Sequence, residues 1–339
     1  MSLEVLAAGV VLIGLIAYAM FAGADFGGGV WTALAWGPRA RVQREAIFRA
    51  MGPVWETNHV WLILIVVTLF TAFPRAFGDL FTALFIPLSI ALIGIVFRGA
   101  AFAFRHYGSE GGARLPATGI VFSAASILTP LTMGMALGAI AGGQITIRGG
   151  QVATELYEPW LRPFSIVCGL IGVAMCGFLT ASYMTTRTGG ALREDFRNRA
   201  LAASLVLGGL TTAAIPVAYA DARPFFDRLG SPAPIAVMSA AVAMGVASLV
   251  VLWRRWYALA PPVAAGTVAL VIAAWGAVQY PYFILPDERI DSVAAGHATL
   301  VAFLVSLPIG ALILIPSLVL LYYTFSERTD RPAPEGPPS

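Results

Sequence analysis

The chain has 339 residues, of which 58% are hydrophobic and only 12% are charged, and its mean hydropathy is +0.81. Soluble globular proteins carry about 25% charged residues, so this composition excludes an ordinary soluble domain. The net charge of +3 does not indicate nucleic-acid binding, because all 21 basic residues are arginines in short clusters between apolar runs. The composition predicts an integral membrane protein with several spans.

Nine apolar runs are long enough to cross a bilayer, which takes about 20 residues for each helix. The first run has neither a basic region before it nor a small-residue cleavage signal, so we expect a retained span rather than a signal peptide. These runs predict one transmembrane domain over residues 1–325, and the polar, proline-rich residues 326–339 predict a disordered tail. The expected spans are 4–35, 53–73, 78–101, 116–141, 162–186, 199–220, 233–253, 258–280 and 296–324.

The arginines predict how the spans are oriented. Fifteen lie in the tail and in the segments that follow the first, third, fifth and seventh runs, and six lie on the other side. By the positive-inside rule the arginine-rich side faces the cytoplasm. We therefore expect an odd number of spans, with the N-terminus outside and the C-terminus in the cytoplasm.

Glycines spaced four apart predict close contacts between helices. Such sets are Gly23 with Gly27, and Gly134, Gly138 and Gly142. Close packing is a sufficient explanation for both. The run Gly27–Gly29 also hints at a broken helix, which is a feature of secondary transporters.

Three ionisable residues in the first two runs are candidates for function. Asp25 lies about 15 Å from the cytoplasmic end of its run, where a carboxylate has to be paired, hydrated or protonated. Glu56 and His59 are three residues apart, so a helix places them on one face near the cytoplasmic end of the second run. The alternatives are an Asp bonded to backbone groups, a Glu that complements a helix dipole, and a His that packs.

Arg98 ends the third expected span on the same side and is a candidate counter-ion for Glu56 or Asp25. The alternative is a guanidinium that extends to the membrane interface. The three histidines of the chain show no spacing typical of haem ligation, which argues against a multi-haem subunit. Two acids, a histidine and an arginine in the cytoplasmic half of neighbouring helices are what a proton pathway would need.

Two long motifs carry a resemblance to a known family. They are Ala24–Gly29 (ADFGGG) and Gly52–Ile63 (GPVWETNHVWLI), and shorter matches occur at Phe97-Arg98, Thr129–Gly138 and Tyr280–Pro286. Together they resemble subunit II of the cytochrome bd-type quinol oxidases. The short chain is similar to the compact, cyanide-insensitive branch of that family.

The resemblance implies an all-α integral membrane protein of the bacterial cytoplasmic membrane. Such a protein would have about nine transmembrane helices, arranged as two four-helix bundles plus one peripheral helix. The implied partner is a haem-bearing subunit I, with two b haems and haem d, that oxidises quinol and reduces oxygen to water. This chain would ligate no haem and no metal. A small single-helix accessory subunit, membrane lipid and quinone are further expected partners, and nucleic acid is not.

In the family, subunit II stabilises subunit I and supplies part of the cytoplasmic proton pathway. The resemblance implies that Glu56 and Asp25 are the acids of that pathway, that Arg98 lies near it, and that His59 is a weaker candidate. The chain departs from many members in having Glu56 where they have Asp.

Two further departures concern Ala22 and Ala103, which stand where some members have acids. Two other functions remain open. One is a proton-coupled secondary transporter with Asp25 as its coupling carboxylate. The other is a structural scaffold in which the acids merely pair with Arg98.

Overall fold

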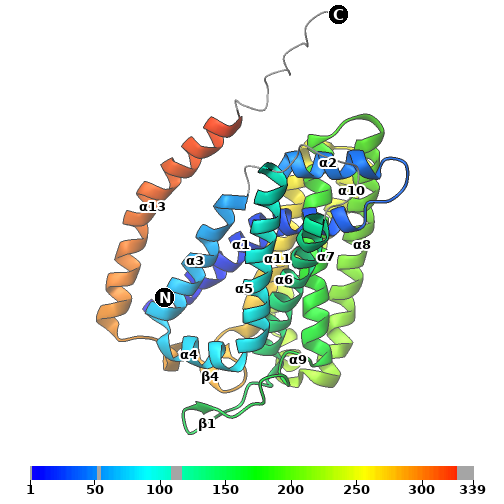
Figure 1. Cartoon of the computed structure of the whole chain (residues 1–339). Coiled ribbons are helices and arrows are strands. Elements are labelled where there is room, and N and C mark those ends of the chain that lie inside the picture. Colours follow the sequence, from blue (N-terminus) through cyan, green and yellow to red (C-terminus); the bar gives the residue numbers. More distant parts are fainter. Residues whose placement is uncertain (1, 52–54, 108–116, 327–339) are drawn as a thin grey trace, which may run out of the picture.

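The computed structural model describes residues 2–51, 55–107 and 117–326, most of which are helical (Figure 1). Two small hairpins of strands are the remaining regular structure described. In chain order the elements are α1 (Leu3–Ala33), α2 (Ala40–Met51), α3 (Trp55–Ala72), α4 (Pro74–Ala83), α5 (Phe85–Tyr107), α6 (Ala117–Gly142), β1 (Ile147–Arg148), β2 (Gln151–Val152), α7 (Pro163–Arg187), α8 (Gly190–Asp221), α9 (Arg223–Leu229), α10 (Pro232–Trp253), the 3₁₀ turn η1 (Tyr257–Leu259), α11 (Ala260–Gln279), β3 (Tyr282–Ile284), β4 (Glu288–Arg289), α12 (Ile290–Val293) and α13 (His297–Ser326).

Within the described ranges, eight helices are long and apolar enough to cross a membrane. A ninth span is possible if the pair His59–Ala72 and Pro74–Ala83, which is bent by 119°, counts as one. The expected span 78–101 is wrong at its start, because α4 occupies its first residues and α5 begins only at Phe85. The bend follows from Pro74, which has no N–H to donate to the preceding turn and starts a new helix instead.

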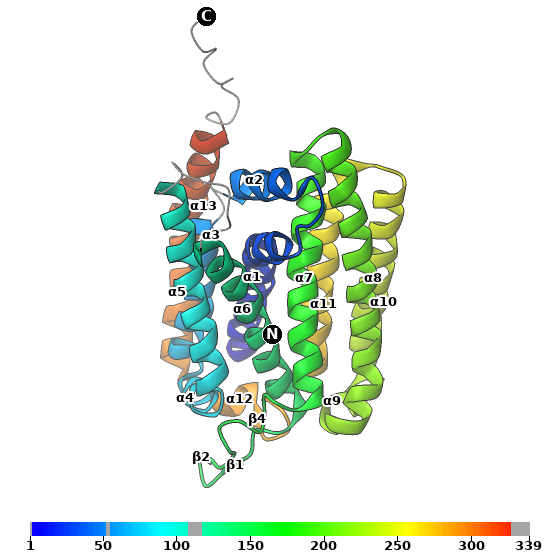
Figure 2. The same cartoon turned by 45° about the vertical axis from the view of Figure 1, so that its right-hand side comes forward.

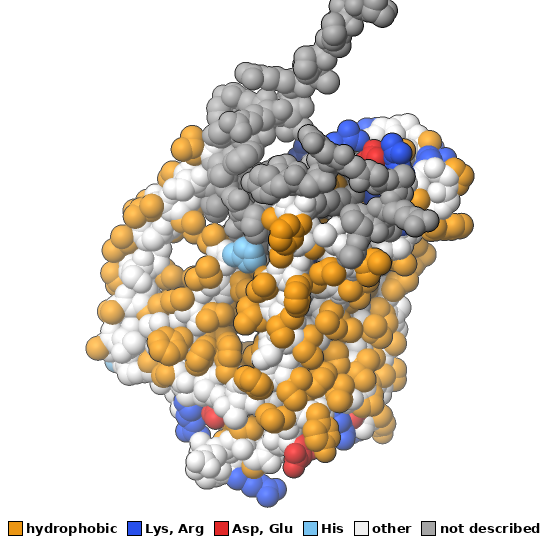
Figure 3. Space-filling view, viewed as in Figure 1, with side chains coloured by type: hydrophobic (Ala, Val, Ile, Leu, Met, Phe, Trp, Pro, Cys, Tyr) orange, Lys and Arg blue, Asp and Glu red, His pale blue; other side chains and the backbone are white. Residues whose placement is uncertain are grey.

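The surface agrees with a membrane location. Hydrophobic side chains cover the middle of the face seen in Figure 3, and charged side chains gather toward its two ends. Long apolar helices with charges confined to their ends are what a bilayer requires, since the hydrocarbon region cannot solvate charge.

Helix α2 lies across one end of the long helices (Figure 2), where the sequence analysis expected only a connecting segment. Its Ile47 is buried against the bundle. Asp195 at the start of α8 accepts hydrogen bonds from Arg39 Nε at 2.7 Å and from Gln43 Nε2 at 2.9 Å. These contacts hold α2 against α8, so that α2 covers the end of α1.

Close helix packing at the predicted glycines is confirmed for α1 against α7 and for α6 against α7. A Cβ at Gly27 would collide with the carbonyl oxygen of Cys176, and one at Gly134 would lie 2.5 Å from the carbonyl oxygen of Cys168. Helix α1 is continuous through Gly27–Gly29. The hint of a broken helix at this point was therefore wrong.

The last helix, α13, leans away from the other long helices and contacts α1 and α3 (Figure 1). Its start is held at the end of the molecule opposite α2. There Leu300 packs with Phe73 at the α3–α4 bend and with Ile290 and Val293 of α12. The β3–β4 hairpin leads directly into α12, so it helps to position the start of α13.

Candidate functional site

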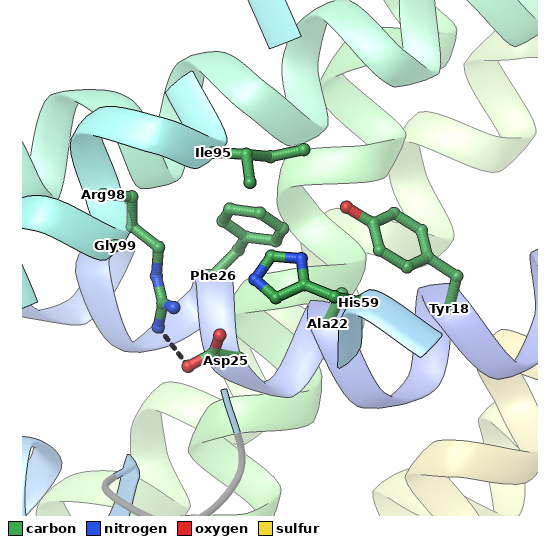
Figure 4. A pocket seen from close by; sticks show the side chains of 8 residues that line it. All are labelled: Tyr18, Ala22, Asp25, Phe26, His59, Ile95, Arg98 and Gly99. Atoms are coloured by element: carbon green, nitrogen blue, oxygen red, sulfur yellow. Dashed lines mark hydrogen bonds and ion pairs between the residues drawn. The ribbon is translucent and has the colours of Figure 1, made fainter. Parts of the chain in front are cut away.

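An ion pair between α1 and α5 forms the centre of the site. Arg98 Nη2 donates a hydrogen bond to Oδ1 of Asp25 (Figure 4), and the two side chains are only 4% and 3% exposed. Burying a single charge costs several kcal/mol, so each group needs the other in this place. The sequence left open whether Arg98 pairs with Asp25 or Glu56, and the structure shows the pair with Asp25.

Aromatic rings from three helices surround the guanidinium. The Arg98 Cζ lies 5.6 Å from the ring centre of Phe26, 5.9 Å from that of Phe102 and 5.3 Å from that of Phe122. Ring faces attract a cation and exclude water from it. The Nε of Arg98 donates to no acceptor within the described part of the chain. The alternative that Arg98 extends to the membrane interface is therefore wrong.

A small cavity adjoins the ion pair. About 10 Å³ of it is open to the centre of a water-sized sphere, which is roughly the room that one water molecule needs. Figure 4 shows side chains from α1, α3 and α5 around this space. Its lining residues are Tyr18, Ala22, Asp25, Phe26, His59, Ile95, Arg98 and Gly99.

His59 brings α3 into the site. Its half-buried ring lines the cavity beside Asp25. Glu56 lies in the first turn of the same helix, but its side chain lies outside the described residues. Three of the four predicted site residues, Asp25, His59 and Arg98, therefore meet in one place, and the position of the Glu56 carboxyl stays a prediction.

Sequence reasoning missed two members of the site, Tyr18 and Phe26. Tyr18 is seven residues before Asp25, so both lie on one face of α1, with Ala22 between them. That periodicity could have identified Tyr18. Phe26 gave no comparable signal, because a phenylalanine in an apolar run is expected simply to pack.

A larger apolar cavity continues from the small one. It is lined mainly by α1, α3, α5, α6, α7 and α11, and about 760 Å³ is open to the centre of a water-sized sphere. Tyr18, Ala22, Phe26 and Ile95 line both cavities. The described residues contain no group of three His, Cys, Asp or Glu side chains that could hold a metal ion. The site can thus hold water and protons at one end and an apolar group at the other.

Comparisons with known proteins identify the family. The model of the cytochrome bd terminal oxidase subunit II family matches residues 3–325. Cytochrome bd-I ubiquinol oxidase subunit 2 of Escherichia coli (strain K12) is 29% identical over 202 residues, which are 58% of this chain and 52% of that protein. Cytochrome bd ubiquinol oxidase subunit 2 of Bacillus subtilis (strain 168) is 25% identical over 219 residues, 64% of this chain and 63% of that one.

One solved structure shares the fold. A chain in the structure of bd oxidase from Geobacillus thermodenitrificans superposes with a TM-score of 0.80, covering 96% of this chain and 99% of that chain at 24% identity. The match to the Escherichia coli protein spans only about half of that protein's length. The family match nevertheless covers nearly the whole chain, and with the apolar helices it indicates a multi-pass protein of the bacterial cytoplasmic membrane. The chain belongs to the cytochrome bd terminal oxidase subunit II family.

Proposed function

We propose that this chain is the non-haem subunit of a bd-type oxidase that reduces oxygen to water with electrons from quinol. In this proposal it stabilises a haem-bearing subunit I and supplies part of the cytoplasmic proton pathway. The observation that carries the proposal is the buried Asp25–Arg98 ion pair, which lies with His59 at a cavity sized for one water. Ionisable groups at membrane depth are costly and are retained chiefly for function.

The proton would move as follows. Glu56, at the cytoplasmic end of α3, takes up a proton from water. The proton passes to a water in the small cavity, within reach of His59 and Asp25, which both line it. Arg98 holds the Asp25 carboxyl in one orientation beside this cavity through their ion pair.

The oxygen chemistry itself belongs to the partner. We propose that subunit I carries two b haems and haem d, and that these transfer the electrons and reduce oxygen. The residues of this chain hold, orient and pass protons. The arginine-rich end with α2 would face the cytoplasm, with the N-terminus outside.

Other partners follow from the apolar cavity and the family. Its size and lining suit a lipid or the tail of a quinone. A small single-helix subunit is a further proposed partner, and membership of the compact, cyanide-insensitive branch remains a prediction from the motifs.

The test of this function uses the complex of this chain with its partner. Glu56→Gln and Asp25→Asn should each lower quinol-dependent oxygen consumption at least about tenfold. This is a conservative expectation, because a positioned proton-transfer group usually contributes about 100-fold or more to a rate. The haem absorption spectrum should stay unchanged. Glu45→Gln is the matched control, because Glu45 lies on α2 with its side chain 48% exposed and should keep normal turnover.

Three outcomes separate the competing functions. Normal oxygen consumption in both variants would leave the acids with a scaffold role. Loss of the haem spectrum together with activity would indicate failed assembly rather than a blocked pathway. Purification of the chain without a haem-bearing partner would favour the proton-coupled transporter instead.

A further inference from the structure

A second buried cluster of charges lies at the opposite end of the molecule from α2, where α4 meets the β3–β4 hairpin (Figures 1 and 2). Its members are Arg75 and Asp79 on α4 and Glu288 on β4. The Nε of Arg75 is 3.2 Å from Oε1 of Glu288 and 4.0 Å from Oδ2 of Asp79. Two carboxyl groups therefore crowd one nitrogen of a single guanidinium.

The carboxyl oxygens are buried and poorly satisfied. The side chains of Glu288 and Asp79 are 4% and 12% exposed. Both oxygens of Glu288 and the Oδ2 of Asp79 are inaccessible and accept no hydrogen bond of acceptable geometry from the described residues. Two ionised carboxylates in this place would repel each other and leave these oxygens without donors, which is costly in a buried site.

We propose that Asp79 and Glu288 hold one shared proton, and that this proton fastens the β3–β4 hairpin to α4. Two carboxylates and one guanidinium sum to a charge of −1, and one bound proton makes the cluster neutral. Both carboxyl groups face the same Arg75 Nε, Glu288 at 3.2 Å and Asp79 at 4.0 Å. The proton comes from water, and it turns one repelling oxygen into an O–H donor for the other carboxylate.

The surroundings favour the protonated form. Burial and, next to it, the negative charge of Asp79 raise the pKa of Glu288 to about 7, against the smaller opposing effect of the Arg75 guanidinium. Asp287 on the hairpin acts in the same direction as Asp79. The ordinary pKa of a Glu is about 4.3, so a proton remains bound at pH values where an exposed Glu has lost its own.

Three further charged groups around the hairpin, Arg289, Arg228 and Asp287, have contacts of their own. Arg289 Nε is 3.2 Å from Asp291 Oδ1 at the start of α12. Arg228 of α9 donates at 2.8 Å to the carbonyl oxygen of Val278, and its guanidinium lies over the ring of Tyr282. On the β1–β2 side, which also packs on α4, Asp287 accepts a hydrogen bond from the backbone N–H of Ile147.

Loss of the proton would also weaken the contacts that hold the start of α13. Ile290 and Val293 follow directly after β4, and both pack against Phe73 and Leu300. A hairpin that loosens from α4 therefore disturbs the contacts that hold the start of α13. This consequence is independent of the proton pathway proposed above, because the two clusters lie near opposite ends of the helices.

The direct test is pH-difference infrared spectroscopy of the complex. The absorption of a buried protonated carboxylic acid should disappear as the pH rises through about 7. It should be missing from Glu288→Gln, whose amide supplies the donor permanently, and altered in Asp79→Asn. Asp291→Asn is the control, because its side chain is 67% exposed, and it should keep the wild-type signal.

Stability supplies the second readout. The folded state binds a proton that the unfolded chain has lost, so the thermal midpoint should fall as the pH rises from about 4.5 to about 7 and then level off. Glu288→Gln should flatten this fall by a few degrees relative to wild type and Asp291→Asn. A wild-type infrared spectrum without a titrating carboxylic acid would overturn the proposal even if a variant fails to assemble. Equal pH profiles for wild type and Glu288→Gln would overturn it as well.

Discussion

Two arginine–carboxylate clusters differ in how many acids face each arginine among the side chains that the structure describes. In the first, Arg98 pairs with Asp25, and the guanidinium is enclosed by aromatic rings. In the second, Arg75 faces both Asp79 and Glu288, and its own side chain is 55% exposed. The first cluster holds a fixed pair of charges, whereas the second holds one more carboxylate than its arginine can neutralise.

The difference shows that burial alone does not decide whether a carboxyl group is protonated. A cation at close range favours the ionised form of a carboxyl group, whereas a second carboxylate beside a shared cation favours the protonated form. Asp25 is thus suited to attract a passing proton, and Glu288 to retain one. The predictions below test this contrast, from the largest expected effect to the smallest.

Arg98→Ala should have the largest effect. It leaves the Asp25 carboxylate buried without its guanidinium, and breaking a buried pair in this way costs about 3–5 kcal/mol. Thermal unfolding and the yield of assembled complex measure the loss. Arg75→Ala is the matched control. Its guanidinium is exposed and contributes less to stability, and its loss favours the protonated, neutral form of Glu288. Equal destabilisation by the two substitutions would remove the contrast.

Replacing both members of the first pair separates stability from function. Asp25→Leu combined with Arg98→Met removes both charges of the pair, so stability should return to within about 1–2 kcal/mol of wild type. Oxygen consumption should nevertheless stay low, because the carboxyl of Asp25 no longer lines the cavity through which the proton passes. Thermal unfolding and oxygen uptake on the same preparation decide the matter. Normal turnover in the double variant would show that the pair serves packing only.

Arg75→Gln should raise the pH at which the second cluster loses its proton. Removing a nearby positive charge disfavours the carboxylate, so the pKa of Glu288 should rise by about one unit from its value of about 7. An infrared titration of the carboxylic acid measures the midpoint. A midpoint that moves to lower pH would contradict the assignment of Arg75 as the shared cation.

Glu45→Ala should have the smallest effect. Glu45 pairs with Arg41 on the surface of α2 at 3.0 Å, with side chains 48% and 82% exposed. Exposed pairs of this kind contribute no more than about 0.5 kcal/mol. Thermal unfolding should therefore match wild type within error at every pH. A loss comparable to that of Arg98→Ala would mean that exposure is a poor guide to the strength of these pairs.

Much of the fold followed from the chain itself. Apolar length predicted most spans to within a few residues, because a helix in a bilayer must be about 20 residues long and apolar. The sequence missed the bend at Pro74 and the helix α2. A proline and an amphipathic segment are compatible with several local structures, and packing selects one: α4 packs on α12, and Gln43 of α2 bonds to Asp195 of α8.

The chain alone also determined which residues could act in the first site, because Asp25, His59 and Arg98 are ionisable groups in or beside apolar runs. It could not determine their partners, since spacing along one helix says nothing about which neighbouring helix it meets. Only the tertiary structure paired Arg98 with Asp25. It alone brought Asp79 close to Glu288, which lies far away in the chain. The reason is physical: burial and charge proximity are properties of packed helices, and the state of an acid depends on both.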